Sequence, residues 1–224
     1  CKELRGKICE VGAQMLGTDV DKVAFDGSYV FVDEDEEEEK KVSLEQVALK
    51  GTFFNNIELQ VVKQHSSPLS PPPFMVGMAE IEMDKETCDF ELVNYVAVVD
   101  CGTPINPALV RVQTEGGIAQ GIGMALFEDV QYTDKGKIRN NSFMQYKIPT
   151  RMDIGKIRVD FESSYEESGP FGAKSIGELV IDTPCPALAE AIYNATGVRF
   201  RELPITPEKI AMGILKKKGT NENS

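Results

Sequence analysis

One short segment of this chain combines residue types that could do chemistry. Gly172–Glu178 reads Gly-Ala-Lys-Ser-Ile-Gly-Glu, so a carboxylate follows directly after a run of small residues. Small residues let a backbone approach a bulky ligand closely, and their N–H groups can face an anion. Glu178 could then accept a proton from a bound reactant as a general base. The spacing alone fits equally well a solvated glutamate that opens the next element.

A second segment, about 55 residues upstream, carries an amide among small residues. Glu115–Gly123 reads Glu-Gly-Gly-Ile-Ala-Gln-Gly-Ile-Gly, within a predicted long helix over 109–127. Gln120 could donate and accept hydrogen bonds to a planar heterocycle or a phosphate. Each interior glycine costs a helix about 1 kcal/mol relative to alanine. Tight helix packing is one explanation; we favour close approach of a ligand, because four glycines within eight residues exceed what packing usually needs.

The first quarter of the chain predicts a small helix–hairpin–helix unit. Apolar spacing predicts a helix over 2–16, closed by Gly17. Asp26-Gly27 between two β-rich runs, 22–25 and 29–32, predicts a hairpin. Ser43 and Gln46 form a capping box for a helix over 44–49 that ends at Gly51. Asp33–Glu39 is an unbroken acidic run, which we interpret as a solvated loop tip; its spacing does not favour a cation site.

The remainder predicts a connector and a larger set of elements. Three consecutive prolines lie in the Pro/Ser-rich segment 64–77, which we interpret as a crossing segment within the fold. Val93–Val99 forms the centre of a long apolar strand. A turn at Thr103–Pro107 leads into the glycine-rich helix. The expected strands are 79–83, 90–100, 137–139, 142–148 and 156–162. The expected helices are 186–196, with Leu188, Ala191, Ile192 and Ala195 inward, and 207–215, followed by a frayed tail.

Hairpins and helices that do not alternate strictly indicate an α+β fold. The order of elements in 2–50 is partly repeated in 79–127, which predicts two related β-hairpin/helix subdomains. We expect a first subdomain over 1–63, a connector over 64–77, a second subdomain over 78–215 that carries the glycine-rich loops, and a polar tail over 216–224.

Composition excludes several classes of partner. A net charge of −12 argues against nucleic acid and against an anionic membrane, and no apolar run reaches the ~18 residues that span a bilayer. Five scattered cysteines indicate free thiols in a reducing compartment, which predicts a cytoplasmic protein. His65 is the single histidine, in a segment that reads as a solvated loop, so a metal site built on histidines is not expected.

Taken together, the motifs resemble the C-terminal part of the molybdopterin-binding domain in the molybdenum hydroxylases, the xanthine dehydrogenase and aldehyde oxidase family. The resemblance covers roughly 1–215 and is densest from Asp100 onward. Four segments carry it: 100–107 resembles a strand-end turn, 115–123 a helix whose glutamine contacts the pterin, 146–149 the strand that follows, and 172–178 the active-site loop. The order and spacing of the segments make the resemblance specific.

The resemblance implies residue roles. Glu178 corresponds to the base that takes a proton from a molybdenum-bound hydroxide, whose oxygen attacks an aromatic heterocycle or an aldehyde. Hydride then passes to a sulfido ligand, and electrons leave through iron–sulfur clusters, usually to a flavin. The resemblance further implies that the cofactor-binding residues of this chain are Gln120, Gly121, Ser175, Ile176 and Gly177.

The resemblance also implies that the site is shared. The family's domain has an earlier lobe with further pterin-binding loops, and these 224 residues show no counterpart of it. With no initiator methionine, the chain looks like a split subunit, a truncated product or an excised domain that holds about half a site. Expected partners are the earlier lobe, iron–sulfur and flavin (FAD) subunits, a small-molecule substrate and a second copy. The alternative is a non-catalytic binding or assembly module with the same fold.

Overall fold

The computed structural model describes residues 1–33, 40–54, 57–64, 66–67, 69–162 and 164–221. The chain forms two compact units, Cys1–Ser66 and Ser67–Ser224. Each unit has one three-stranded sheet with helices packed on it, which confirms the predicted α+β class. His65 and residues 34–39 of the acidic run, both predicted to be solvated, lie outside the described residues.

The first unit is built on an antiparallel sheet in the order β1-β2-β3. Its small core consists of Ile8, Val11, Val30 and Val47, contributed by both helices and the central strand. Its elements are α1 (Lys2–Leu16), the short 3-10 helix η1 (Val20–Lys22), β1 (Val23–Phe25), β2 (Tyr29–Val32), β3 (Lys41–Ser43) and α2 (Leu44–Phe54).

Local sequence signals specify most of this unit. Gly17 ends α1, as predicted, and it adopts the left-handed conformation. In the hairpin turn, an Asp26 carboxylate oxygen accepts hydrogen bonds from the backbone N–H of Ser28 and Tyr29 at 2.7 and 2.8 Å. The capping box is confirmed, because Ser43 N–H donates to the Gln46 side chain and Gln46 N–H donates to the Ser43 hydroxyl.

The prediction that Gly51 ends α2 is wrong. The helix continues to Phe54, and Gly51 is buried inside it. A Cβ at this position would lie 3.2 Å from the backbone oxygen of Ile57, and the Ile57 N–H donates to the Gly51 oxygen at 2.9 Å. The glycine is therefore used for close backbone packing rather than for termination.

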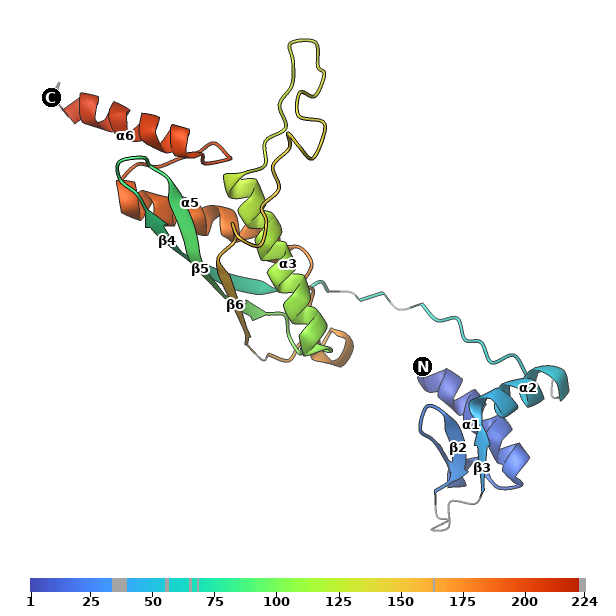
Figure 1. Cartoon of the computed structure of the whole chain (residues 1–224). Helices are drawn as coiled ribbons and strands as arrows, with labels where there is room; N and C mark the ends of the chain where they lie inside the picture. Colours follow the sequence, from blue (N-terminus) through green and yellow to red (C-terminus); the bar gives the residue numbers. More distant parts are fainter. Residues whose placement is uncertain (34–39, 55–56, 65, 68, 163, 222–224) are drawn as a thin grey trace. The chain divides into compact units, whose positions relative to one another are not determined.

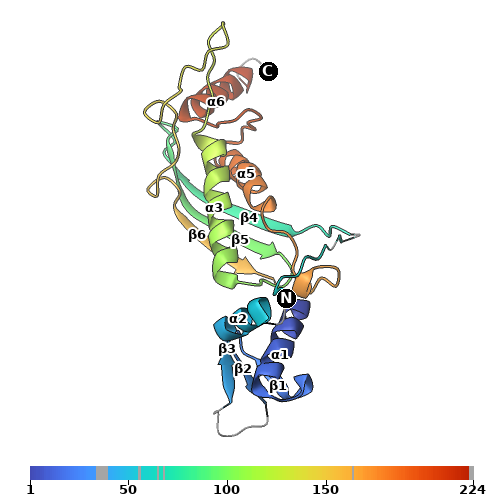
Figure 2. The same cartoon turned by 90° about the vertical axis from the view of Figure 1, so that its right-hand side faces the viewer.

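The second unit is built on β4 (Phe74–Met83), β5 (Phe90–Asp100) and β6 (Lys156–Phe161), in that order across the sheet. β4 and β5 form the predicted antiparallel hairpin, whereas β6 pairs with β5 in parallel. Both α3 (Pro107–Leu126) and α5 (Pro184–Thr196) pack against the sheet and against each other (Figures 1 and 2).

The core of this unit lies between the sheet and these helices. Tyr95, Ala97 and Val99 of β5 are fully buried there, in one cluster with Ile118, Ile122, Leu188, Ile192 and Ile210. The remaining helical elements are the 3-10 turn η2 (Pro170–Gly172), the one-turn helix α4 (Leu179–Asp182) and α6 (Pro207–Asn221).

Two predicted strands, at 137–139 and 142–148, are wrong. The strand that the resemblance placed at 146–149 overlaps the second of them and is also wrong. Between α3 and β6 the chain forms turns and one isolated bridge, Tyr132 with Ile138. Figure 1 shows this segment, 127–155, projecting from the helices and the sheet; we call it the arm. Three large apolar side chains of the arm are 87–91% exposed, namely Phe143, Met144 and Met152. Among the described residues, no sheet edge reaches this segment, so its β-prone residues have no strand to pair with.

Other boundaries differ in ways that the local chemistry explains. Residues 74–77, placed in the connector, are the first four of β4, because Phe74 pairs with Asp100. α3 begins two residues early, since the Asn106 side chain caps it by accepting from Leu109 N–H. α5 also begins two residues early, and its Ala195 is exposed rather than inward. α6 continues to Asn221 instead of fraying after 215.

Candidate functional site

The predicted catalytic and loop residues lie together at the start of α4. Glu178 immediately precedes this helix and is exposed, and its side chain makes no capping hydrogen bond. Ser175 and Gly177 are also exposed, while Ile176 is half-buried against the main core. Glu178 does open the next element, as its structural interpretation required. Among the described residues, however, the Glu178 carboxylate accepts no hydrogen bond that would cap α4.

Two glycines of α3 bring the Gln120 helix against this loop. A Cβ on Gly117 would lie 2.2 Å from the Val180 side chain, and a Cβ on Gly121 would lie 2.7 Å from both the backbone oxygen of Ile181 and the ring of Pro184. α4 can therefore lie directly on α3 only because these positions lack side chains. Gln120 is adjacent to this contact and exposed, whereas Gly121 is buried.

Packing accounts for most of the glycines in α3. Gly117 and Gly121 allow the contact with α4, and a Cβ on Gly123 would collide with the Glu128 side chain. Gly116 is different: it is exposed, and no described atom lies within 4 Å of the place where its Cβ would be. Gly116 and Gln120 are four residues apart, so they share one face of the helix. Ligand approach, our favoured explanation for all four glycines, stays a prediction for Gly116, where the fold offers no other reason.

The geometry of the loop fits an anionic, hydrogen-bonding group such as molybdopterin. Gly177 has no described atom within 4 Å of its missing Cβ, and its φ lies outside the left-handed region. A Cβ there would project into open space. Among the described residues, the backbone N–H groups of 175–178 donate to no other protein group. Consecutive free N–H groups are what an oxyanion or a pterin oxygen accepts from.

A partly buried ion pair lies directly before this loop. The Lys174 ammonium nitrogen is 2.6 Å from a carboxylate oxygen of Asp100, at the end of β5. The other carboxylate oxygen accepts hydrogen bonds from the Ser164 hydroxyl at 2.6 Å and from Gly102 N–H at 3.0 Å. These donors, Lys174 first, lower the pKa of Asp100 to about 2. Our sequence analysis placed Asp100 and Lys174 in two separate motifs but missed their pairing.

Acid should remove the contribution of this carboxylate to stability. Because the folded-state pKa is about 2 against a usual 3.8, ionised Asp100 contributes about 2 kcal/mol at neutral pH. The contribution is complete above pH 4 and is lost as the pH falls through about 2. We expect Asp100→Asn to be less stable than the native chain at pH 7, by a margin that shrinks between pH 4 and pH 2. Urea unfolding of both proteins measures this; Asp134→Asn, an exposed aspartate, is the control. A margin independent of pH would contradict the assignment.

Phe171 is a second residue whose conformation the sequence did not predict. It is 80% exposed and has a left-handed φ of 55°, directly before Gly172. Left-handed backbone costs a residue with a Cβ about 1–2 kcal/mol, and strain of this kind is concentrated at functional sites.

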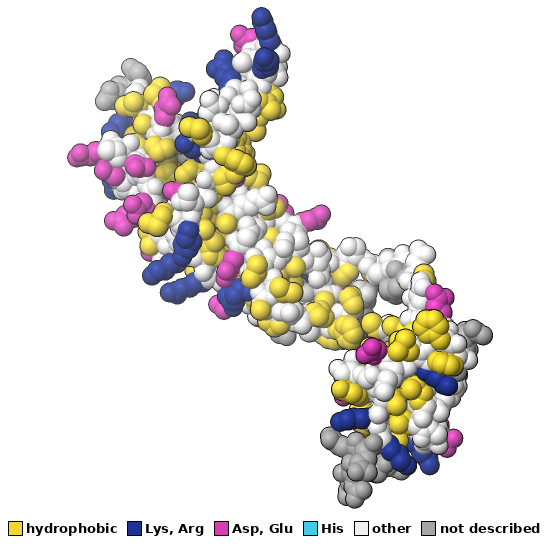
Figure 3. All heavy atoms as spheres, turned by 45° about the vertical axis from the view of Figure 1, so that its right-hand side comes forward, with side chains coloured by type: hydrophobic (Ala, Val, Ile, Leu, Met, Phe, Trp, Pro, Cys, Tyr) yellow, Lys and Arg dark blue, Asp and Glu magenta, His cyan; other side chains and the backbone are white. Residues whose placement is uncertain are grey.

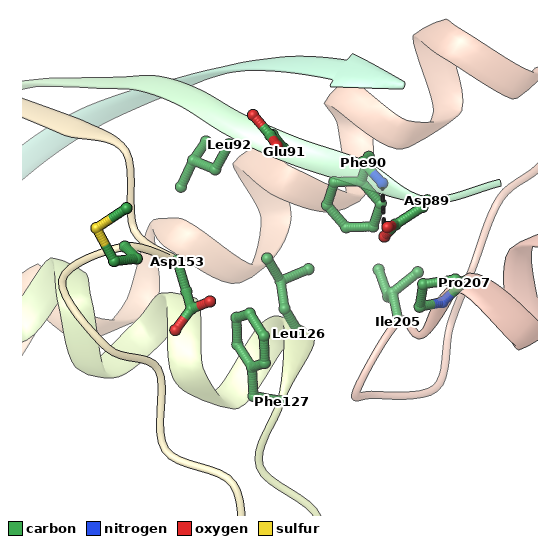
Figure 4. Close-up of a pocket in the computed structure, with 10 residues that line it drawn as sticks. Asp89, Phe90, Glu91, Leu92, Leu126, Phe127, Asp153, Ile205 and Pro207 are labelled. Carbon is green, nitrogen blue, oxygen red and sulfur yellow. Dashed lines mark hydrogen bonds between the residues drawn. The ribbon is translucent and has the colours of Figure 1, made fainter. Parts of the chain in front are cut away.

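A cavity of about 400 Å³ lies elsewhere in the same unit (Figure 4). Leu126 and Phe127, at the C-terminal end of α3, form part of its wall, and Figure 4 shows Asp153 among the lining side chains. None of the predicted site residues lines it. Within the described part of the chain, no cluster of three His, Cys, Asp or Glu residues could hold a metal ion, and no helix is long and apolar enough to cross a membrane.

The second unit thus combines a mixed sheet with a short glycine-containing loop that ends in the exposed carboxylate of Glu178. The profile of the molybdopterin cofactor-binding domain matches residues 1–155. The chain thus belongs to the molybdopterin cofactor-binding domain family of the molybdenum hydroxylases.

Relatives and solved structures agree with this assignment. The chain is 34% identical over 222 residues to the probable hypoxanthine oxidase XdhD of Escherichia coli K12, covering 96% of this chain and 22% of that protein. It is 31% identical over 176 residues to the putative xanthine dehydrogenase molybdenum-binding subunit XdhA of the same strain, covering 77% and 23%. Quinoline 2-oxidoreductase from Pseudomonas putida 86 superposes with a TM-score of 0.69 at 26% identity, covering 96% and 28%. The chain therefore spans about a fifth of the length of these curated relatives.

Proposed function

We propose that this chain supplies the C-terminal part of the active site in a xanthine dehydrogenase-like oxidoreductase that hydroxylates an aromatic heterocycle or an aldehyde. One observation carries the proposal. The free N–H groups of 175–178 and the open side of Gly177 adjoin a glutamate that the local fold does not use. When bound, the molybdenum cofactor supplies the two-electron oxidation and the water-derived oxygen.

In this proposal, the residues of this chain bind and orient the cofactor. The amides of Ser175–Glu178 hold the cofactor by hydrogen bonds, and Gln120, on the neighbouring helix, adds a donor and an acceptor. Gly121 serves the site by letting α4 approach α3, and Ile176 anchors the loop to the core. Glu178 accepts the proton that the reaction releases. A correctly placed general base is typically worth ~10²–10⁴ in rate.

We infer that the remainder of the site comes from the rest of the molybdenum domain, with iron–sulfur clusters and FAD on other domains or subunits. The relatives support this inference, since one is named as a molybdenum-binding subunit and this chain spans only about a fifth of each. We place the assembly in the reducing cytoplasm, where five free cysteines are compatible with function. A non-catalytic assembly module remains the second candidate; the unused carboxylate of Glu178 favours the enzyme.

Expressed as these 224 residues, the chain should not retain the cofactor. We expect it to purify with far less than one molybdenum per chain, because its exposed loop holds the group from one side only. The same chain isolated from its native source with its partners should carry about one. Metal analysis and pterin fluorescence on both preparations test this. Stoichiometric cofactor in the isolated chain would show that the site is complete without partners, and an absence of molybdenum from the native assembly would contradict the proposed function.

The isolated chain should also associate with itself or with a partner. Hydrophobic side chains are visible at the surface of both units (Figure 3). On β4, Phe74, Val76 and Met78 are 57–64% exposed on the face opposite the buried core residues. Exposed apolar patches of several hundred Å² mark interaction sites. We expect sedimentation experiments to show concentration-dependent oligomers, weakened by Val76→Lys; a strict monomer at high concentration would contradict this expectation.

A further inference from the structure

The Glu178 loop is held at its two ends, and between them the Ile176 side chain packs against the core. Before the loop, Lys174 forms the partly buried ion pair with Asp100. After it, the Thr183 hydroxyl is 3.0 Å from the hydroxyl of Tyr95, which is fully buried in the sheet. Between these anchors, the backbone N–H groups of 175–178 have no acceptor among the residues that the structure describes. The position of these N–H groups therefore depends on the two anchors and on the contact of Ile176 with the core.

The anchor before the loop is built from backbone and side chain together. Lys174 N–H donates to the Cys101 oxygen at 2.7 Å, and Thr103 N–H donates to the Gly172 oxygen at 2.8 Å. Gly102 and Ala173 form a bridge between these bonds. A Cβ on Gly102 would lie 2.3 Å from the Gly172 oxygen, so the two strands of chain touch directly.

The lysine side chain completes this anchor at a cost. Its side chain is 8% exposed, its ammonium lies 2.6 Å from Asp100, and the same ammonium is 5.3 Å from the centre of the Phe74 ring. Burying an ammonium is unfavourable, and apolar residues of similar volume often stabilise a fold as well or better. Besides the stability that ionised Asp100 contributes at neutral pH, the pair imposes a single geometry on the start of the loop.

We propose that Lys174 is a positioning residue, whose ion pair with Asp100 holds residues 175–178 in the conformation that presents Glu178 to the cofactor. The Lys174 ammonium is paired with Asp100 and the lysine side chain is only 8% exposed, so its role in this proposal is to hold the loop. The consequence for cofactor binding rests on the proposed function, whereas the ordering of the loop is a property of this chain alone.

Backbone ¹⁵N relaxation of the 224-residue chain tests the ordering directly. In the native chain we expect order parameters of about 0.85 for 175–178. In Lys174→Met we expect them to fall below about 0.6. The strand residues of β5 should keep their native values. Asp100→Asn preserves the shape of the side chain and an oxygen that can accept from Ser164, and it should lower the same order parameters. This variant decides the question if Lys174→Met does not fold. Lys174→Arg keeps the charge and should restore part of the order. Arg199→Met breaks an exposed ion pair with Glu190 in the same unit and should leave the loop unchanged.

Three outcomes would overturn the proposal: a native loop that is already mobile, a loop that stays ordered in Lys174→Met and Asp100→Asn, or a uniform loss of order across the whole unit. In the assembled enzyme, Lys174→Met should lower molybdenum content several-fold and reduce kcat more than it raises KM. If the native assembly contains no molybdenum, the proposed function fails while the relaxation result still decides the role of Lys174.

Discussion

Replacing Glu178 by glutamine in the assembled enzyme is expected to abolish turnover while the cofactor stays bound. The amide keeps the shape of the carboxylate and most of its hydrogen-bonding capacity, but it cannot accept a proton. Loss of a positioned general base costs ~10²–10⁴ in rate. The free amides of 175–178, which we propose hold the cofactor, belong to the backbone and are retained in this variant. Steady-state kinetics and metal analysis on the same preparation measure both effects.

A matched variant separates this effect from a general change in charge. Glu202→Gln alters an exposed glutamate in a loop of the same unit and should leave kcat and molybdenum content unchanged. Near-normal turnover of Glu178→Gln would show that the carboxylate is not the base. Joint loss of cofactor and activity would instead assign Glu178 to holding the loop. Gln120→Ala, which removes a side-chain contact, is expected to lower molybdenum content and activity together.

Two alanine substitutions in α3 are expected to change stability in opposite directions. Both glycines are interior to the helix, so each gains about 1 kcal/mol in helix propensity. Gly121→Ala, however, places a Cβ 2.7 Å from the backbone of Ile181 and from Pro184, whereas Gly116→Ala meets no described atom within 4 Å. Overpacking costs about 1–3 kcal/mol. The propensity gain cancels in the comparison, so Gly121→Ala should be less stable than Gly116→Ala by that amount.

The same pair distinguishes packing from ligand approach. Chemical unfolding of the 224-residue chain carrying each substitution gives the two free energies of unfolding, which should bracket the native value. In the assembled enzyme, Gly116→Ala should lower molybdenum content despite its greater stability, if the cofactor approaches that face of α3. Unchanged cofactor content would leave the exposed glycine without a role in binding. Equal stability of the two variants would mean that α4 does not lie on α3 as described.

Local signals were sufficient wherever a few neighbouring residues specify the backbone. The capping box at Ser43, the Asp26 turn and the left-handed Gly17 were all predictable, because each depends on hydrogen bonds or sterics within a few residues. The motifs around Gln120 and Glu178 were recognisable for a similar reason, since small residues beside one polar side chain stand out in any sequence. The arm was mispredicted because β-prone residues form a strand only when a sheet edge is available to pair with them.

Contacts between distant segments required the folded chain. Gly51 and Gly121 have the same local signature as a helix end or a ligand-binding glycine, and only the neighbouring Ile57 and Ile181 oxygens show that both serve packing. Asp100 and Lys174 are 74 residues apart, and their ion pair forms because the end of β5 and the Glu178 loop meet in space. The motifs and the family were thus recognisable from the sequence alone, because they depend on residues that are close together in the chain. Burial and the pairing of distant charges depend instead on which segments the folded core brings together.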